Sequence, residues 1–181
     1  MNKTFLAGAL LAFSTPVFAQ ESTATLPVDC FQELGGADLA RDMTDDYLKD
    51  SGIGEGPAMP VQERLDAVAG ACSDRHGVEG EQARPFFMAN LGYLVSEDLE
   101  QRLIELGFDM GPLDEATALL VADPDFALGE YIDARPEIYA NPAEQIAERH
   151  GLTFDETVAL IGGYIGIRAL QLNNAALLEA S

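Results

Sequence analysis

Apolar residues recur along this chain at spacings of three and four residues, and strand-like alternation of apolar and polar residues is scarce. Such spacing places apolar side chains on one face of an α-helix and predicts helices along nearly the whole chain. Glycine and proline divide the pattern, because they favour the ends and the starts of helices, respectively. We expect helices at residues 28–34, 37–50, 60–75, 81–94, 96–106, 112–122, 124–140 with a break at Pro136, 142–149 and 153–179.

These segments predict an all-α fold, a compact multi-helix bundle with a long, apolar C-terminal helix. A chain of this size can bury about two thirds of its surface, which is enough for one hydrophobic core. We therefore expect a single helical domain over residues 20–181, and a subdivision near residue 95 is the alternative. The final helix is expected to begin with a capping box, in which Thr153 and Glu156 bond each other's backbone amides.

The predicted C-terminal helix has one charged residue, Arg168, between Thr157 and Leu178. Glycine inside a helix costs up to about 1 kcal/mol relative to alanine, so its repeated use there favours a role in packing. We expect close helix packing in the core, or an interface with a partner or a second copy, and Gly166→Leu should then destabilise the fold or an oligomer. The small residues share one narrow stripe: Ala159, Gly162, Gly166, Ala169, Asn173 and Ala176.

The first 19 residues are typical of a secretory signal peptide. Lys3 precedes an apolar stretch, and cleavage is expected after Ala19. The protein is then expected in the bacterial periplasm or outside the cell. Cys30 and Cys72 are the only cysteines, and in an oxidising compartment we expect them to form a disulfide. Closing that loop would stabilise the fold by roughly 4 kcal/mol.

Charge narrows the choice of partners. The chain has 31 acidic and 10 basic residues and a formal net charge of −21, which becomes −22 when Lys3 is lost with the signal. Such a protein is repelled by nucleic acids and by anionic membranes. The uninterrupted apolar run of the C-terminal helix is also too short to span a membrane, so no stable membrane insertion is expected. This charge is compatible with a surface that is simply solvated, with a basic protein partner and with the binding of divalent cations.

Candidate chemistry is sparse. His76 and His150 each precede a glycine at a predicted helix end, where a protonated imidazole can bond the last carbonyl groups; a catalytic or metal role is the alternative. No Gly-x-Ser-x-Gly motif and no zinc-like spacing of His and Cys occurs, so we assign no catalytic residue, no metal and no cofactor. Four acidic residues fall largely along one face of a predicted helix. They are interpreted either as a solvated surface or as a calcium site: Asp42, Asp45, Asp46 and Asp50.

Together, these features predict an exported, soluble, acidic helical protein that acts by protein binding, as an accessory subunit, an inhibitor or an immunity-type factor. Its partner is expected to be another exported or envelope protein of basic character, and a homodimer stays open. The chain is similar in outline to small periplasmic acid-stress chaperones, which are exported, helical and joined by one disulfide. That resemblance implies chaperone activity at low pH as one alternative. A small hydrolase-type enzyme that uses a histidine and carboxylates is another.

Overall fold

The computed structural model describes residues 27–50 and 59–180, so the expected signal peptide and its cleavage site lie outside the described residues. Within these two ranges the chain forms seven α-helices and one short 3-10 helix, and no strand. This confirms the predicted all-α fold. The elements are α1 (Cys30–Asp50), α2 (Met59–His76), η1 (Gly80–Gln82), α3 (Ala83–Glu105), α4 (Met110–Ala122), α5 (Leu128–Asp133), α6 (Ala140–His150) and α7 (Phe154–Glu179).

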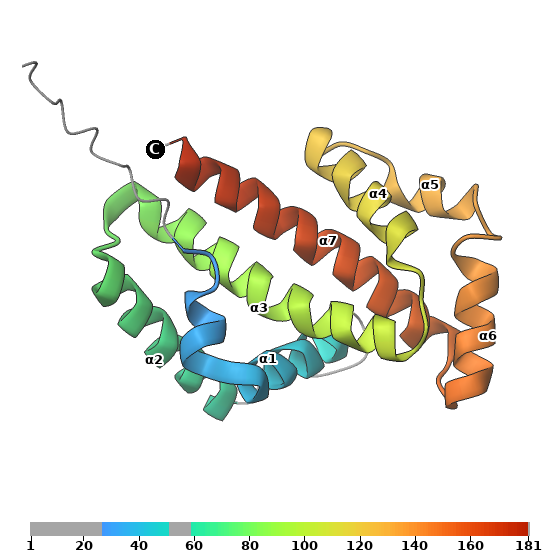
Figure 1. The fold of residues 1–181 in the computed structure, drawn as a ribbon, viewed down its shortest axis with the longest axis horizontal. Helices are drawn as coiled ribbons and strands as arrows, with labels where there is room; N and C mark the ends of the chain where they lie inside the picture. The colour runs from blue at the N-terminus through green and yellow to red at the C-terminus, as the bar shows by residue number, and fades with distance from the viewer. Residues whose placement is uncertain (1–26, 51–58, 181) are drawn as a thin grey trace, which may run out of the picture.

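The antiparallel pair α3 and α7 forms the centre of the molecule (Figure 1). Helix α1 packs on α3 and α2 packs on α1, whereas α4 and α6 pack on α7. The pair therefore has two differently covered ends. We call the part covered by α1 and α2 the disulfide end, and the part covered by α4, α5 and α6 the groove end.

Two clusters of buried side chains correspond to these ends, and they meet on α3 between Leu94 and Val95. The cluster of the disulfide end includes Phe31, Phe86 and Leu178. The cluster of the groove end is larger, and its most deeply buried members are Leu99, Leu103, Leu113, Ala116, Ala143 and Ile165. Both α3 and α7 contribute to both clusters, so one helix pair supports the whole core.

The predicted disulfide is present and joins the start of α1 to α2. Cys30 and Cys72 are buried, and their Cα atoms lie 6.1 Å apart. Asn90 of α3 holds the same region, because its side-chain amide donates to the Pro27 carbonyl (3.1 Å) and its oxygen accepts from the Phe31 amide (3.3 Å). The start of α1 is thus held by one covalent and two polar contacts.

Local signals place several boundaries correctly. Gly36 has φ 68°, a left-handed conformation that favours glycine, and α1 kinks there between the predicted segments 28–34 and 37–50. The capping box at the start of α7 is also confirmed. The Thr153 amide donates to the Glu156 carboxylate (2.7 Å), and the Glu156 amide donates to the Thr153 hydroxyl (3.2 Å).

Two predicted boundaries are wrong. Helix α3 continues through residue 95, because Ser96 is buried and its hydroxyl donates to the Tyr93 carbonyl within the helix (3.2 Å) instead of capping a new one. The predicted helix 124–140 is reduced to the six residues of α5. A turn precedes α5, in which the Asp123 side chain accepts a hydrogen bond from the Asp125 amide (3.1 Å). Pro136 lies in the turns that follow α5. Among the described helices, none combines the length and the apolar character needed to cross a membrane.

Candidate functional site: an apolar groove beside α7

Two members of the small-residue stripe of α7, Gly162 and Gly166, do not pack closely against another element. Apart from its neighbours and the backbone of its own helix, a Cβ atom added to either glycine would meet no atom of the described residues within 4 Å, so neither position requires glycine for packing among them. The expectation of close core packing at these two positions is therefore wrong. Of the remaining members Ala169 is buried, Ala159 and Asn173 are half-buried and Ala176 is exposed.

The close approach occurs at residues outside the stripe. A Cβ atom added to Gly92 of α3 would lie 2.7 Å from Cβ and 3.0 Å from Cα of Gln171 in α7. A Cβ atom on Gly163 would lie 2.9 Å from the Tyr47 ring of α1. Real Cβ contacts are longer than this, so glycine at both positions allows the helices to pack as closely as they do. The sequence offered no signal for either, because each depends on a residue far away in the chain.

An apolar groove lies along the open side of the first half of α7, and we call it the α7 groove. Its volume is about 220 Å³. One wall comes from α5, the following turns and the start of α6, and the other from α7. The side chains of Phe154 and Val158 are 42% and 40% exposed, one helical turn apart on α7. The lining residues are Ile132, Asp133, Pro136, Tyr139, Ala140, Phe154, Val158, Ile161 and Gly162.

The wall formed by α5 and the turns after it is anchored to the core. The Tyr139 hydroxyl donates to the Pro112 carbonyl (3.0 Å), and burial, followed by the neighbouring Tyr131, raises the pKa of Tyr139 to about 12. The Arg135 guanidinium lies 3.8 Å from the centre of the Tyr131 ring and donates to the Tyr131 carbonyl (3.1 Å). These contacts brace the wall internally and join it to α4, which packs on α7, so the groove is present in the fold without a partner.

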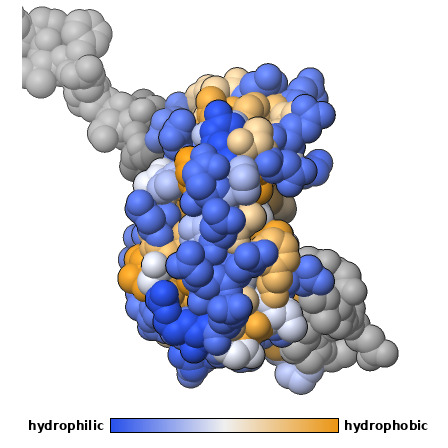
Figure 2. Space-filling model, turned by 90° about the vertical axis from the view of Figure 1, so that its right-hand side faces the viewer, coloured by the Kyte–Doolittle hydropathy of each residue, from blue (hydrophilic) through white to orange (hydrophobic). Residues whose placement is uncertain are grey.

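The groove end is strongly acidic. Residues 109–166 include 12 Asp and Glu but only two arginines, and no lysine. Arg135 is stacked on Tyr131, and Arg149 is exposed in the last turn of α6. Figure 2 shows this end of the molecule as a mostly hydrophilic surface with smaller apolar patches beside it. An apolar groove within such an acidic surface can attract a partner both by hydrophobic contact and by its negative electrostatic field.

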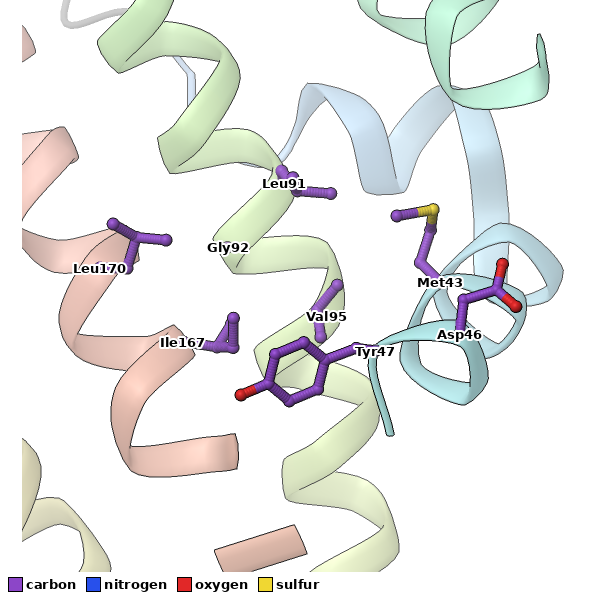
Figure 3. A pocket seen from close by; sticks show the side chains of 8 residues that line it. All are labelled: Met43, Asp46, Tyr47, Leu91, Gly92, Val95, Ile167 and Leu170. Carbon is purple, nitrogen blue, oxygen red and sulfur yellow. The ribbon is translucent and has the colours of Figure 1, made fainter. Parts of the chain in front are cut away.

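A second apolar pocket of about 170 Å³ lies between α1, α3 and α7 (Figure 3). The Asp46 carboxylate points away from Ile167 and Leu170 on the opposite wall. The pocket adjoins Gly92, where the close approach of Gln171 leaves no room for a side chain. We therefore regard it as a packing gap where three helices meet. Its lining residues are Met43, Asp46, Tyr47, Leu91, Gly92, Val95, Ile167 and Leu170.

The two histidines lie in separate places at helix ends, as predicted. His76 ends α2, with its ring centre 6.2 Å from that of Phe86 at the disulfide end. His150 ends α6 before Gly151, is exposed, and lines an open depression with Arg102 and Glu105. The depression brings no buried carboxylate to His150.

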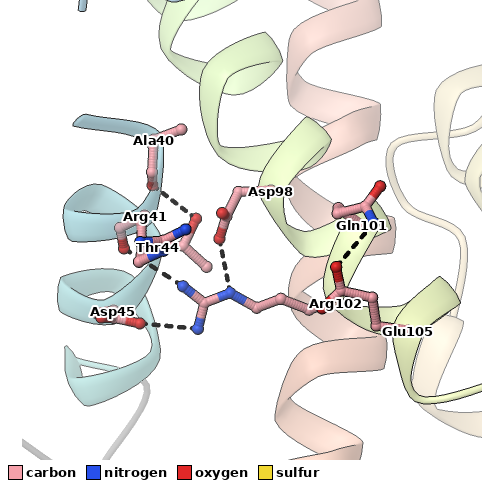
Figure 4. A network of polar contacts seen from close by, with 8 residues as sticks. All are labelled: Ala40, Arg41, Thr44, Asp45, Asp98, Gln101, Arg102 and Glu105. Carbon is pink, nitrogen blue, oxygen red and sulfur yellow. Dashed lines mark hydrogen bonds and ion pairs between the residues drawn. The ribbon is translucent and has the colours of Figure 1, made fainter. Parts of the chain in front are cut away.

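The acidic face of α1 carries ion pairs (Figure 4). Arg102 of α3 bonds Asp45 of α1 (2.8 Å) and Asp98 of α3 (2.7 Å), which joins the two helices. Asp42 forms an ion pair with Arg64 of α2. Residues 27–50 and 59–180 contain no group of three His, Cys, Asp or Glu side chains placed to hold a metal ion. Asp42 and Asp45 thus bind arginines of neighbouring helices.

Comparison with protein-family models, with curated proteins and with solved structures finds no match for this chain. The functional argument therefore depends on the α7 groove and on the charge around it.

Proposed function

We propose that this protein acts by binding another protein through the α7 groove, as an accessory subunit, an inhibitor or an immunity-type factor. The observation that carries the proposal is the pair Phe154 and Val158, both about two-fifths exposed, in the wall of a preformed apolar groove. Partners commonly bind by placing one or two large apolar side chains in such a pocket. Apolar side chains that remain exposed together favour an interaction surface.

The groove would supply part of the free energy of binding. Full burial of a valine or phenylalanine side chain contributes about 1.5–3 kcal/mol. Covering the exposed parts of Phe154 and Val158 would then contribute about 1 kcal/mol each, or roughly a thirtyfold gain in affinity together. A partner side chain buried in the groove adds its own transfer energy. The two walls need no rearrangement to receive it, which reduces the entropy lost on binding.

The proposal includes export to the periplasm or the cell exterior. The signal-like pattern of residues 1–19 supports it, and a Cys30–Cys72 disulfide is compatible with an oxidising compartment. The partner is accordingly another exported or envelope protein.

Site-specific photo-crosslinking in the organism that encodes the protein tests this proposal. A photoreactive residue replaces Val158 in the full chain, and the same residue replaces Ile104, which is 49% exposed on α3, as the control. We expect a discrete crosslinked protein from position 158 and none from position 104. Equal products from both positions, or no product from position 158, would contradict binding through the groove.

Chaperone activity at low pH is a second candidate, supported by the ion pairs of Arg102. Loss of negative charge from the chain's 31 acidic residues at low pH would weaken the Arg102–Asp45 ion pair that joins α3 to α1 and favour exposure of apolar surface. The test is suppression of client aggregation by the mature chain at pH 2–3. Arg102→Gln should then shift the onset of activity to higher pH. Failure to suppress aggregation at any pH would exclude this candidate.

A further inference from the structure

We infer that the α7 groove receives a basic amphipathic helix of the partner, an inference that rests on the protein binding proposed above. One large apolar side chain of that helix occupies the groove between Pro136 and Val158, and lysine or arginine side chains on the adjacent turns face the acidic surroundings.

The shape of the α7 surface favours a helix. Gly162 in the groove wall and Gly166 one turn beyond it leave open space along α7. A partner backbone can therefore lie closer to α7 there than side chains would allow. Ala159 and Asn173 are half-buried along the same stripe, which extends about 21 Å from residue 159 to residue 173 at the rise of an α-helix and is interrupted by the buried Ala169. Helices that dock in grooves place apolar side chains at intervals of three and four residues, which matches such a surface.

The charges around the groove favour basic residues on the polar face of this helix. Among the residues that the structure describes, Asp133 is the only charged one that lines the groove, and no basic one lines it. Exposed acidic side chains adjoin its walls in sequence, with Glu137 after Pro136 and Asp155 after Phe154. Arg135, the nearest basic residue in sequence, has its guanidinium over the Tyr131 ring. Lysine and arginine on a bound helix would be attracted to this rim, and acidic residues would be repelled.

A pair of designed peptides serves as the probe. Both are 18-residue helices with leucine and one phenylalanine on one face, and the polar positions are lysine in one peptide and glutamate in the other. We expect the lysine peptide to bind the mature chain, residues 20–181, at least about tenfold more tightly at low salt, measured by fluorescence anisotropy. The difference should shrink at high ionic strength, because salt screens exposed charges.

Matched variants locate the binding. Gly162→Leu places a side chain in the groove, and Gly70→Leu places one at an equally open glycine of α2, outside the groove. We expect Gly162→Leu to weaken the lysine peptide by about tenfold or more and Gly70→Leu to leave it unchanged. Asp133→Asn, at an exposed position, should weaken the lysine peptide without affecting the melting temperature.

Three results would overturn the inference: equal affinity for both peptides, equal effects of Gly162→Leu and Gly70→Leu, or no binding of the lysine peptide. If the lysine peptide does not bind while position 158 still crosslinks to a protein, the basic helix is excluded and protein binding stands. If both experiments fail, the proposed function fails as well.

Discussion

The two ends of the α3–α7 pair use similar residues differently. At the disulfide end, Gly92 is required because Gln171 lies against it, and a disulfide joins the helices that cover the pair. At the groove end, a Cβ atom added to Gly162 or Gly166 of the same central pair would contact no other element among the described residues. A glycine in a helix therefore indicates close packing only where another element is present to use the space.

This difference indicates how stability and binding are divided in the molecule. The disulfide end buries its aromatic side chains Phe31 and Phe86 completely or nearly so. The groove end leaves Phe154 and Val158 partly exposed in a groove. We expect substitutions at the disulfide end to change the free energy of unfolding, and substitutions in the groove to change binding.

Removal of the disulfide should have the largest effect. Cys30→Ser combined with Cys72→Ser should lower the free energy of unfolding by about 2–5 kcal/mol, because the unfolded chain loses a constraint over a long loop. Denaturant unfolding under non-reducing conditions measures it. Reduction of the wild-type protein should give the same loss, and an unchanged midpoint in both cases would show that the disulfide does not brace this end.

Gly92→Ala should have the next largest effect. The added methyl group would contact the Gln171 backbone and separate α3 from α7, at a cost of about 1–3 kcal/mol in unfolding free energy. Gly70→Ala on α2, where the space is open, is the control and should not destabilise the protein. Equal thermal stability of the two variants would contradict the close packing described at Gly92.

The capping box provides a comparable test at the groove end. Thr153→Ala removes the hydroxyl that accepts from the Glu156 amide and should cost about 1 kcal/mol. Thr153→Ser retains the hydroxyl and should recover most of that loss. Thermal unfolding of the three proteins measures the difference, and a serine variant as unstable as the alanine variant would argue against the cap.

Gly166→Ala should act in the opposite direction to Gly92→Ala. The added methyl group meets no atom, and alanine is favoured over glycine inside a helix, so the unfolding free energy should rise by about 0.4–1 kcal/mol. Gly166→Leu should likewise leave the isolated fold intact, contrary to the expectation from the stripe alone. A lower melting temperature together with a change in particle size would instead show that a second copy covers this face.

Two glutamates at the groove end should give opposite pH dependences. Hydrogen bonds from Thr153 lower the pKa of Glu156, so its stabilising effect is complete above the unfolded pKa of about 4.3 and is lost as pH falls through the lower folded pKa. Burial, followed by Glu97, raises the pKa of Glu100, so its charge opposes folding at neutral pH. Glu156→Gln should therefore destabilise the protein at pH 7, and Glu100→Gln should stabilise it. Unfolding midpoints between pH 3 and pH 7 that change alike for both variants would contradict this assignment.

The features that sequence analysis predicted correctly depend on neighbouring residues. The break between residues 34 and 37 and the capping box of Thr153 with Glu156 are determined within a few positions of the chain, although the left-handed residue at the break is Gly36 and not Gly35. The disulfide followed from the presence of only two cysteines. Such signals are available without knowledge of the tertiary structure.

The features that it missed depend on residues far apart in the chain. Periodicity identified the stripe on α7 but not which face another helix would cover, and the close approach involves Gly92 and Gln171 instead. The α7 groove combines residues 132–140 with residues 154–162, and no motif links the two segments. Asn90 gives no local sign that it bonds to Pro27 and Phe31.

The contacts of Asn90 also imply an order of assembly. A chain emerges with its N-terminus first, so Cys72 becomes available before Asn90 does. The two thiols can therefore meet before α3 exists to fix the start of α1. Disulfide formation would then join α1 to α2 first. The side chain of Asn90 would form its hydrogen bonds with Pro27 and Phe31 only after α3 has formed.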